Sequence, residues 1–173
     1  MHSSCQDTDA TLLYDKLLLH LTENSARNAL IAADLVQNRA HYNLILSDRI
    51  NHLERILALL PCELQQQAVL ITGKSKPKER EQAMEDLRSG KKRYLFATYR
   101  LAKEGLDIPR LDRLYLITPQ KDYAIIVQAV GRIARHFDGK SEPVVYDYVD
   151  NITFCMNQYK KRCTSYRKIH CKF

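Results

Sequence analysis

The fold is decided by Leu95-Phe96-Ala97-Thr98, which leads to Gly105-Leu106-Asp107-Ile108-Pro109, and by a second stretch, Gln128-Ala129-Val130-Gly131-Arg132-Ile133-Ala134-Arg135. The apolar run predicts a short buried strand, 93–97, that ends in Thr98. A hydroxyl at the carboxyl end of a parallel strand lies where ligands bind in open α/β sheets. Gly105 permits a backbone conformation that is closed to other residues, and Asp107 places a carboxylate beside it. We therefore expect a ligand-facing loop after a core strand.

The second stretch predicts a helix, 123–136, with Asp122 as its N-cap. Gln128, Arg132 and Arg135 are spaced by four and three, so they rise along one face with Gly131 beside them. Guanidinium groups bind phosphate oxygens in a bidentate manner, and Gly131 removes a side chain that would hold a ligand away. This stripe predicts a polyphosphate site. The alternative is an amphipathic helix whose arginines are solvated or paired with Asp or Glu.

Together these stretches resemble motifs V and VI of the superfamily 2 helicases, in the form Thr…Gly-x-Asp and Gln-x-x-Gly-Arg-x-x-Arg. The stretch Leu44-Ile45-Leu46-Ser47-Asp48-Arg49 resembles motif IV, and Ile71-Thr72-Gly73 resembles the strand end called motif IVa. Gln128 stands where the DEAD-box RNA helicases usually place His, which favours the DExH and XPB-like groups. The resemblance covers about residues 41–150 and implies a C-terminal RecA-like domain, with a parallel sheet sandwiched by helices.

The resemblance also implies roles for single residues. Arg132 and Arg135 would be arginine fingers on the transferring γ-phosphoryl group, and Gln128 would orient the phosphate or the attacking water. Gly105 and Asp107 would couple the nucleotide site to nucleic acid. The residues expected to touch the sugar-phosphate backbone of one strand are Ser47, Thr72, Gly73 and Thr98.

Two lysines extend the predicted nucleic-acid interface. Lys74 and Lys76 adjoin the carboxyl end of the strand predicted at 68–72, so they are our candidates for phosphate-backbone contacts. Gly73-Lys74-Ser75 also imitates the end of a Walker A motif. The upstream glycine of that motif would fall at Ala68, inside the strand, and Pro77 predicts a new helix start. We therefore do not interpret this turn as a phosphate loop.

ATP and Mg²⁺ are the cofactors that the resemblance implies. No Walker A motif and no Asp-Glu-x-His stretch occurs in the 173 residues. Both cofactors would therefore be held mainly by an N-terminal RecA-like domain of the same protein, and this chain alone is expected to be inactive toward ATP.

Alternating strand and helix patterns predict the parallel sheet independently, because near-continuous apolar strands need cover on both faces. The expected strands are 42–46, 68–72, 93–97, 113–117 and 144–148. The expected helices are 11–21, capped by Thr8 or Asp9, then 25–37, capped by Asn24, and 50–60, 77–89, 123–136 and 152–167, with a short edge strand at the end. We divide the chain into an N-terminal helical segment (1–40, with residues 1–8 frayed), a RecA-like domain (41–150) and a C-terminal helix and tail (151–173).

The composition of the chain limits the class of partner that it is expected to bind. A net charge of +7 favours a polyanion, and 45% apolar with 27% charged residues excludes a disordered chain. Five cysteines without a Cys-x-x-Cys pair predict reduced thiols in an intracellular protein and no metal site. No apolar run approaches twenty residues, so no membrane span is expected.

The C-terminal part bears on which nucleic acid is bound. Residues 146–150 and the basic, tyrosine-containing helix after them are similar to helicases of large DNA viruses and mobile elements, which favours DNA over RNA and extends the expectation to a viral source. Two alternatives stay open. One is a non-catalytic nucleic-acid-binding module, against which the intact Gln128, Arg132 and Arg135 argue. The other is the motor domain of a restriction system, which a neighbouring nuclease domain would reveal.

Overall fold

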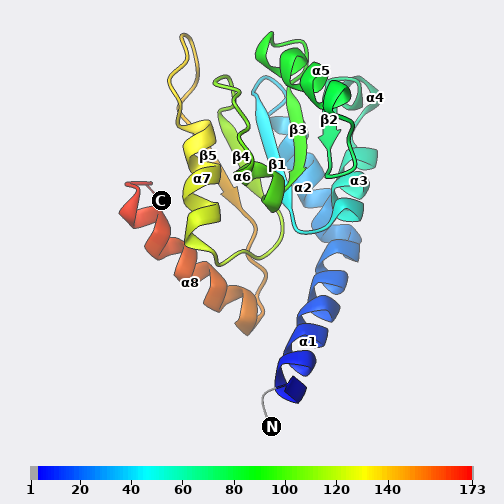
Figure 1. Cartoon of the computed structure of the whole chain (residues 1–173), viewed down its shortest axis with the longest axis vertical. Coiled ribbons are helices and arrows are strands. Elements are labelled where there is room, and N and C mark those ends of the chain that lie inside the picture. The colour runs from blue at the N-terminus through cyan, green and yellow to red at the C-terminus, as the bar shows by residue number, and fades with distance from the viewer. Residues whose placement is uncertain (1–3, 173) are drawn as a thin grey trace.

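A five-stranded parallel sheet forms the centre of the molecule, with helices on both faces (Figure 1). The computed structural model describes the backbone of residues 4–172 and the side chains from Thr11 to Lys172. The strand order is β2-β3-β1-β4-β5. The elements are α1 (Ser4–Glu23), α2 (Ser25–Gln37), β1 (Asn43–Ser47), α3 (Ile50–Leu59), α4 (Cys62–Gln65), β2 (Ala68–Ile71), α5 (Pro77–Arg88), β3 (Tyr94–Thr98), α6 (Tyr99–Lys103), β4 (Arg113–Leu116), α7 (Tyr123–Ile133), β5 (Val144–Asp147) and α8 (Thr153–Lys168).

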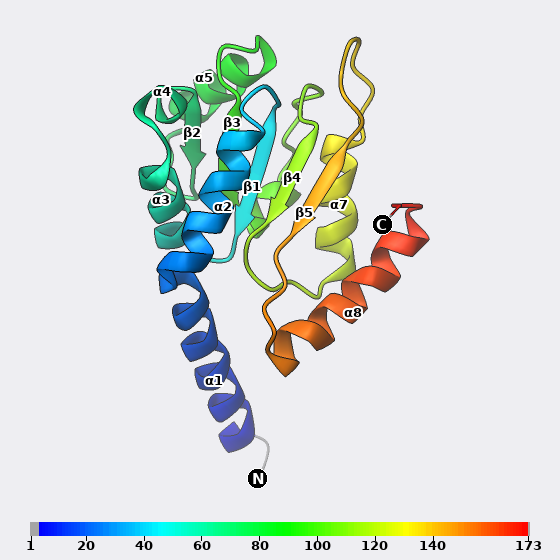
Figure 2. The ribbon, with the colours of Figure 1, turned by 180° about the vertical axis from the view of Figure 1, so that it is seen from behind.

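Two cores lie on opposite faces of the sheet. On one face α2 and α3 pack through Ile31, Leu35 and Ile56, and on the other α5 and α7 pack through Leu87 and Ile126. Figure 2 shows α2 crossing the first face, whereas α7 covers the second face in Figure 1 and α8 lies beside α7. All five residues of β1 are buried, because successive side chains point to alternate faces and both faces are covered.

The register of the strands brings the motif residues together. Parallel pairing of β1 with β3 places Ser47 beside Thr98, and both residues stand at the carboxyl end of their strands. The helix α1 projects beyond this carboxyl edge, and α8 begins near it (Figures 1 and 2). The sheet therefore presents the ends of motifs IV and V at one edge, flanked by an N-terminal and a C-terminal helix.

The predicted strands are confirmed, each end within one residue, and so is α2, where the Asn24 side chain accepts a hydrogen bond from the Arg27 amide. The prediction for the first helix is wrong at its start. The helix α1 begins at Ser4, so Thr8 and Asp9 lie inside it and residues 4–8 are helical. The short helices α4 and α6 were not predicted, and the part of the chain described after α8 contains no edge strand. The division at residues 40 and 150 stays a prediction.

Candidate nucleotide and nucleic-acid interface

Ser47 lies at the carboxyl edge but faces inward. Its side chain is fully buried, and its hydroxyl accepts a hydrogen bond from the Arg49 amide at 3.1 Å and donates one to Nδ1 of His52 at 3.2 Å. The other ring nitrogen, Nε2, donates to the Asn28 amide oxygen at 2.9 Å. This chain of hydrogen bonds joins α2 and α3 to the end of β1. The structure thus gives the Ser47 hydroxyl internal partners and does not bring it to the surface.

His52 is neutral in this environment. Burial, together with the nearby Arg27 and Arg55, lowers its pKa to about 3. A neutral imidazole can donate from one nitrogen and accept at the other, which is the pattern that Asn28 and Ser47 require. His52 therefore fixes the backbone loop that carries Asp48 and Arg49.

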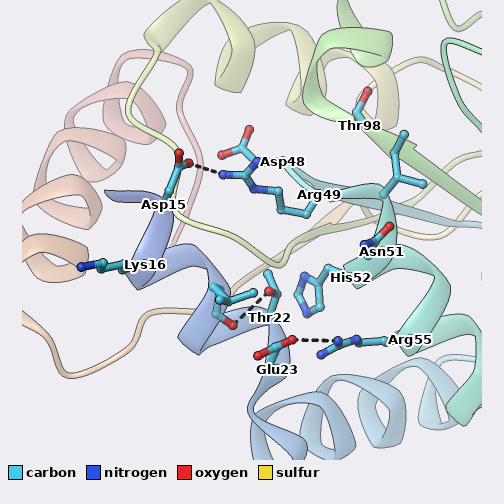
Figure 3. Close-up of a pocket in the computed structure, with 12 residues that line it drawn as sticks. Asp15, Lys16, Thr22, Glu23, Asp48, Arg49, Asn51, His52, Arg55 and Thr98 are labelled. Atoms are coloured by element: carbon cyan, nitrogen blue, oxygen red, sulfur yellow. Dashed lines mark hydrogen bonds and ion pairs between the residues drawn. The ribbon is translucent and has the colours of Figure 1, made fainter. Parts of the chain in front are cut away.

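A cavity of about 700 Å³ opens between α1 and the carboxyl edge (Figure 3). Half-buried Thr98 lines it from β3, and Arg49 and Arg55 line it from the start and middle of α3. The opposite wall is α1. Figure 3 shows that Asp15 of α1 points to Arg49 and Glu23 to Arg55, and both contacts are ion pairs.

The turn between β2 and α5 uses its own side chains to satisfy its amides. The Thr72 amide donates to Oγ of Ser75 at 3.0 Å, and the Lys74 amide donates to Oγ1 of Thr72 at 3.2 Å. The Lys76 amide reaches Oε2 of Glu79 at 3.3 Å, which starts α5. These amides are therefore engaged, whereas a phosphate loop directs its amides to the ligand. The side chains of Lys74 and Lys76 and the backbone of Gly73 are exposed.

The arginine motif lies on α7, on the face of the sheet that α6 also covers. Asp122 caps the helix as predicted, because its Oδ1 accepts from the amides of Ala124 and Ile125 at 2.9 and 3.3 Å. Buried Ile126 and Ala129 hold α7 against the sheet. The outer side of the helix presents Gln128, Gly131 and Arg132, of which the first two are exposed.

Arg135 lies beyond the helix, so the predicted three-residue helical stripe is wrong at its last position. The helix ends at Ile133 with Ala134 as its C-cap, and Arg135 instead forms an ion pair with Asp107. That pair joins the end of motif VI to motif V. Gly105 makes possible the turn between α6 and Asp107, because its φ of +89° is in the left-handed region. The alternative of arginines paired with carboxylates is thus realised for Arg135.

Arg132 is held differently. One terminal nitrogen, Nη2, contacts the backbone oxygen of Ala102 at 3.5 Å, and Nε is buried without a hydrogen-bond partner among the described residues. Burial lowers the pKa of Arg132, with a further contribution in the same direction from Arg135 and an opposing one from Asp107. A partly desolvated cation with an unfilled donor is stabilised by an anion. An oxyanion such as a phosphate therefore fits this position.

A buried arginine of α8 supports the start of α7. Arg162 of α8 makes a bidentate ion pair with Asp147 at 2.7 and 2.8 Å and donates to the backbone oxygen of Gln120 at 2.7 Å. Tyr166 also donates to Asp147, at 2.7 Å. These contacts tie α8 to β5 and to the loop that leads into α7. No local pattern in the sequence marks Arg162, Asn28 or His52, because their partners come from distant elements.

The described residues contain neither a cluster of metal-binding side chains nor a membrane-spanning helix. No group of three or more His, Cys, Asp or Glu side chains in that part of the chain could hold a metal ion. None of its helices is both long and apolar enough to cross a membrane.

Solved structures share this fold. T4 UvsW superposes with a TM-score of 0.69 at 18% identity, over 90% of this chain and 35% of that one. The structure of S. cerevisiae Dbp5 bound to RNA and ADP BeF3 gives a TM-score of 0.64 at 18% identity, over 82% and 35% of the two chains. The chain thus shares its RecA-like fold, a parallel sheet between two layers of helices, with these structures.

The sequence places the chain within a family. The model of the helicase conserved C-terminal domain matches residues 25–137, and the chain belongs to this family. A relative named "Probable helicase D10" from Escherichia phage T5 is 29% identical over 138 residues, which are 78% of this chain and 30% of the relative. The chain spans between 14% and 30% of the length of the curated relatives that it matches.

Proposed function

We propose that this chain is the second RecA-like domain of an ATP-dependent helicase or translocase that acts on nucleic acid, DNA rather than RNA. The observation that carries the proposal is Arg132, a half-buried guanidinium on the α6–α7 face whose Nε has no partner among the described residues. Next to it, Arg135 is paired with Asp107 of motif V. Both arginines would act as fingers that stabilise negative charge on the transferring phosphoryl group.

ATP, when bound with Mg²⁺, supplies the phosphoryl group, and a partner N-terminal RecA-like domain would hold most of both. The residues of this chain then have distinct tasks. Arg132 neutralises charge at the phosphates and Gln128 orients the phosphate or a water molecule. Gly131 keeps the helix surface free of a side chain beside Arg132, and Gly105 with Asp107 links this site to the carboxyl edge.

Nucleic acid would bind along the carboxyl edge through its backbone. The accessible residues at this edge would contact sugar and phosphate groups; they are Thr98, Thr72, Gly73, Lys74 and Lys76. Such contacts would bind the strand without distinguishing its base sequence. Ser47 is buried, so its part in this interface would be to shape the loop before Arg49. The similarity of the C-terminal part to helicases of DNA viruses and mobile elements supports DNA.

A phosphate-release assay tests the division of labour between domains. This chain alone should not hydrolyse ATP, because arginine fingers act only when the phosphates and Mg²⁺ are already held in line. Addition of the N-terminal domain, in one chain or in trans, should produce activity that depends on Arg132 and Arg135. Activity of the chain alone that is lost in Lys74→Ala and kept in Arg132→Ala would reject the proposal.

Fluorescence anisotropy across a salt series tests the second half of the proposal. Binding of single-stranded DNA should be weak and independent of sequence, with an affinity that falls with salt by a logarithmic slope of about 0.7 per phosphate contact. An oligothymidylate should bind more tightly than an oligouridylate. Salt-insensitive binding, or a strong preference for one sequence, contradicts the predicted backbone contacts.

A non-catalytic nucleic-acid-binding module is the second candidate. The ion pair of Arg135 with Asp107 favours it, because that contact engages one of the two arginines. A two-domain protein that binds DNA normally but shows no phosphate release would establish this alternative.

A further inference from the structure

The cavity under α1 contains two arginines that already bind oxyanions. Arg49, the residue before α3, pairs with the Asp15 carboxylate, and Arg55 on α3 pairs with the Glu23 carboxylate at 2.9 Å. A carboxylate and a phosphate present the same acceptor oxygens to a guanidinium. Both carboxylates come from α1, which lies outside the family match at residues 25–137.

Much of the remaining lining also suits a phosphate, although the Asp48 carboxylate lines the cavity as well. The helix α3 starts without a side-chain cap, and Ile50, Asn51 and His52 of its first turn line the cavity. Amides at a helix N-terminus carry a partial positive charge and favour anions. Thr98, the motif V hydroxyl, lines the same cavity and places it on the proposed path of the nucleic-acid strand.

The contacts of α1 allow it to act as a removable cover. Its C-terminal part is anchored by buried Leu18 and Leu21, whereas Leu12 and Leu13 are exposed. One turn before Leu18, Tyr14 of α1 donates a hydrogen bond to Asp48 at 3.0 Å and packs on Phe154 of α8. The two ion pairs are about half exposed, with side-chain exposures of 45% to 53%. Such pairs are weak and compete poorly with a polyanion.

We infer that Arg49 and Arg55 form a phosphate-binding site for single-stranded nucleic acid, and that Asp15 and Glu23 of α1 occupy this site until the strand displaces them. The inference rests on the proposed function and adds a competing element to it. Binding then requires exchange of two carboxylates for backbone phosphates. The helix α1 sets the affinity of the carboxyl edge rather than merely flanking it.

The test is a binding measurement on the 173-residue chain with a fluorescein-labelled oligothymidylate. The double variant Asp15→Asn with Glu23→Gln should bind more tightly, by about two- to fivefold for each ion pair removed. The control is Glu63→Gln with Asp138→Asn, which changes the net charge equally at two exposed side chains far from the cavity lining. Thermal unfolding checks that all variants are folded.

A variant that lacks both arginines separates an effect at this site from a general effect of α1 on binding. With Arg49→Gln and Arg55→Gln, affinity should fall below that of the original chain, and removal of the two carboxylates should then bring no gain. An equal gain in the control variant, or a gain that persists without the arginines, overturns the inference while the proposed function stands. Absence of binding by every variant would overturn the proposed function, and this site with it.

Discussion

The carboxyl edge and the α6–α7 face hold their arginines in different ways. At the carboxyl edge Arg49 and Arg55 are half exposed and each is paired with a carboxylate of α1. On the α6–α7 face Arg132 is more buried, its pKa is lowered by burial, and its Nε has no partner among the described residues. Exposed paired cations exchange partners at little cost, whereas a desolvated cation gains much from one well-placed anion. The first region therefore suits phosphates that replace one another, as those of a sliding nucleic-acid strand would, and the second suits a single bound anion.

The largest effect that distinguishes the two regions should come from Arg132. In a protein that also contains the proposed N-terminal RecA-like domain, Arg132→Ala should lower DNA-stimulated phosphate release by about 10³-fold and leave DNA affinity almost unchanged. Arg132→Lys should not rescue turnover, because an ammonium group cannot reproduce the guanidinium fork. Arg100→Ala on α6, which removes a highly exposed arginine, is the matched control.

Thr98→Ala is the counterpart of Arg132→Ala at the carboxyl edge. It should mainly weaken the stimulation by DNA, because Thr98 is proposed to contact the nucleic-acid backbone and not the nucleotide. If both variants are folded and lose DNA binding equally, the separation of the two regions is refuted.

The buried histidine behind the loop before α3 should make the stability of the fold depend on pH. His52 has a pKa of about 3 in the folded chain, below the ordinary value of 6.5. The unfolded chain therefore takes up a proton first as the pH falls, and stability is lost from about pH 6.5 down toward 3. The contribution between pH 7 and pH 5 is about 2 kcal/mol.

Chemical denaturation at the two pH values measures this effect. Asp48, whose pKa is raised by burial, changes the stability with the opposite sign. It is present both in the original chain and in the His52→Gln variant, so its effect cancels in the comparison. In His52→Gln the loss between pH 7 and pH 5 should shrink by the histidine contribution. An unchanged loss in this variant would show that His52 is not the group responsible.

The smallest effects should come from two glycines of the α6–α7 face, with opposite signs. Gly105→Ala should destabilise the fold by about 1–2 kcal/mol, because an alanine is strained at a φ of +89°. Gly131→Ala should stabilise it by up to about 1 kcal/mol, since a Cβ there meets nothing within 4 Å and alanine favours a helix.

Denaturation curves and phosphate release together sharpen this contrast. Gly131→Ala should lower turnover despite its higher stability, because the added methyl group lies one residue from Arg132 on the exposed side of α7. If turnover and stability rise together, Gly131 has no role in ligand approach.

Sequence patterns determined much of the fold because their physical causes are local. The Asn24 and Asp122 caps satisfy amides within one helical turn, and the apolar strands depend on the alternation of side chains. Motif spacing also identified Arg132 and Gln128 as neighbours on one helix. The same reasoning began α7 at the right residue but extended it to 136 instead of Ile133, since the point where a helix ends depends on what receives the next side chain.

Tertiary structure decided the partners of the charged groups. Asp107 takes Arg135 away from the helical stripe across 28 residues, and His52 with Asn28 turns Ser47 inward. The carboxylates of α1 reach Arg49 and Arg55 only because α2 crosses the sheet and delivers α1 to the carboxyl edge. Such contacts depend on strand order and helix placement, which no local spacing encodes. The residue types at the site were therefore predictable, but their engagement with one another was not.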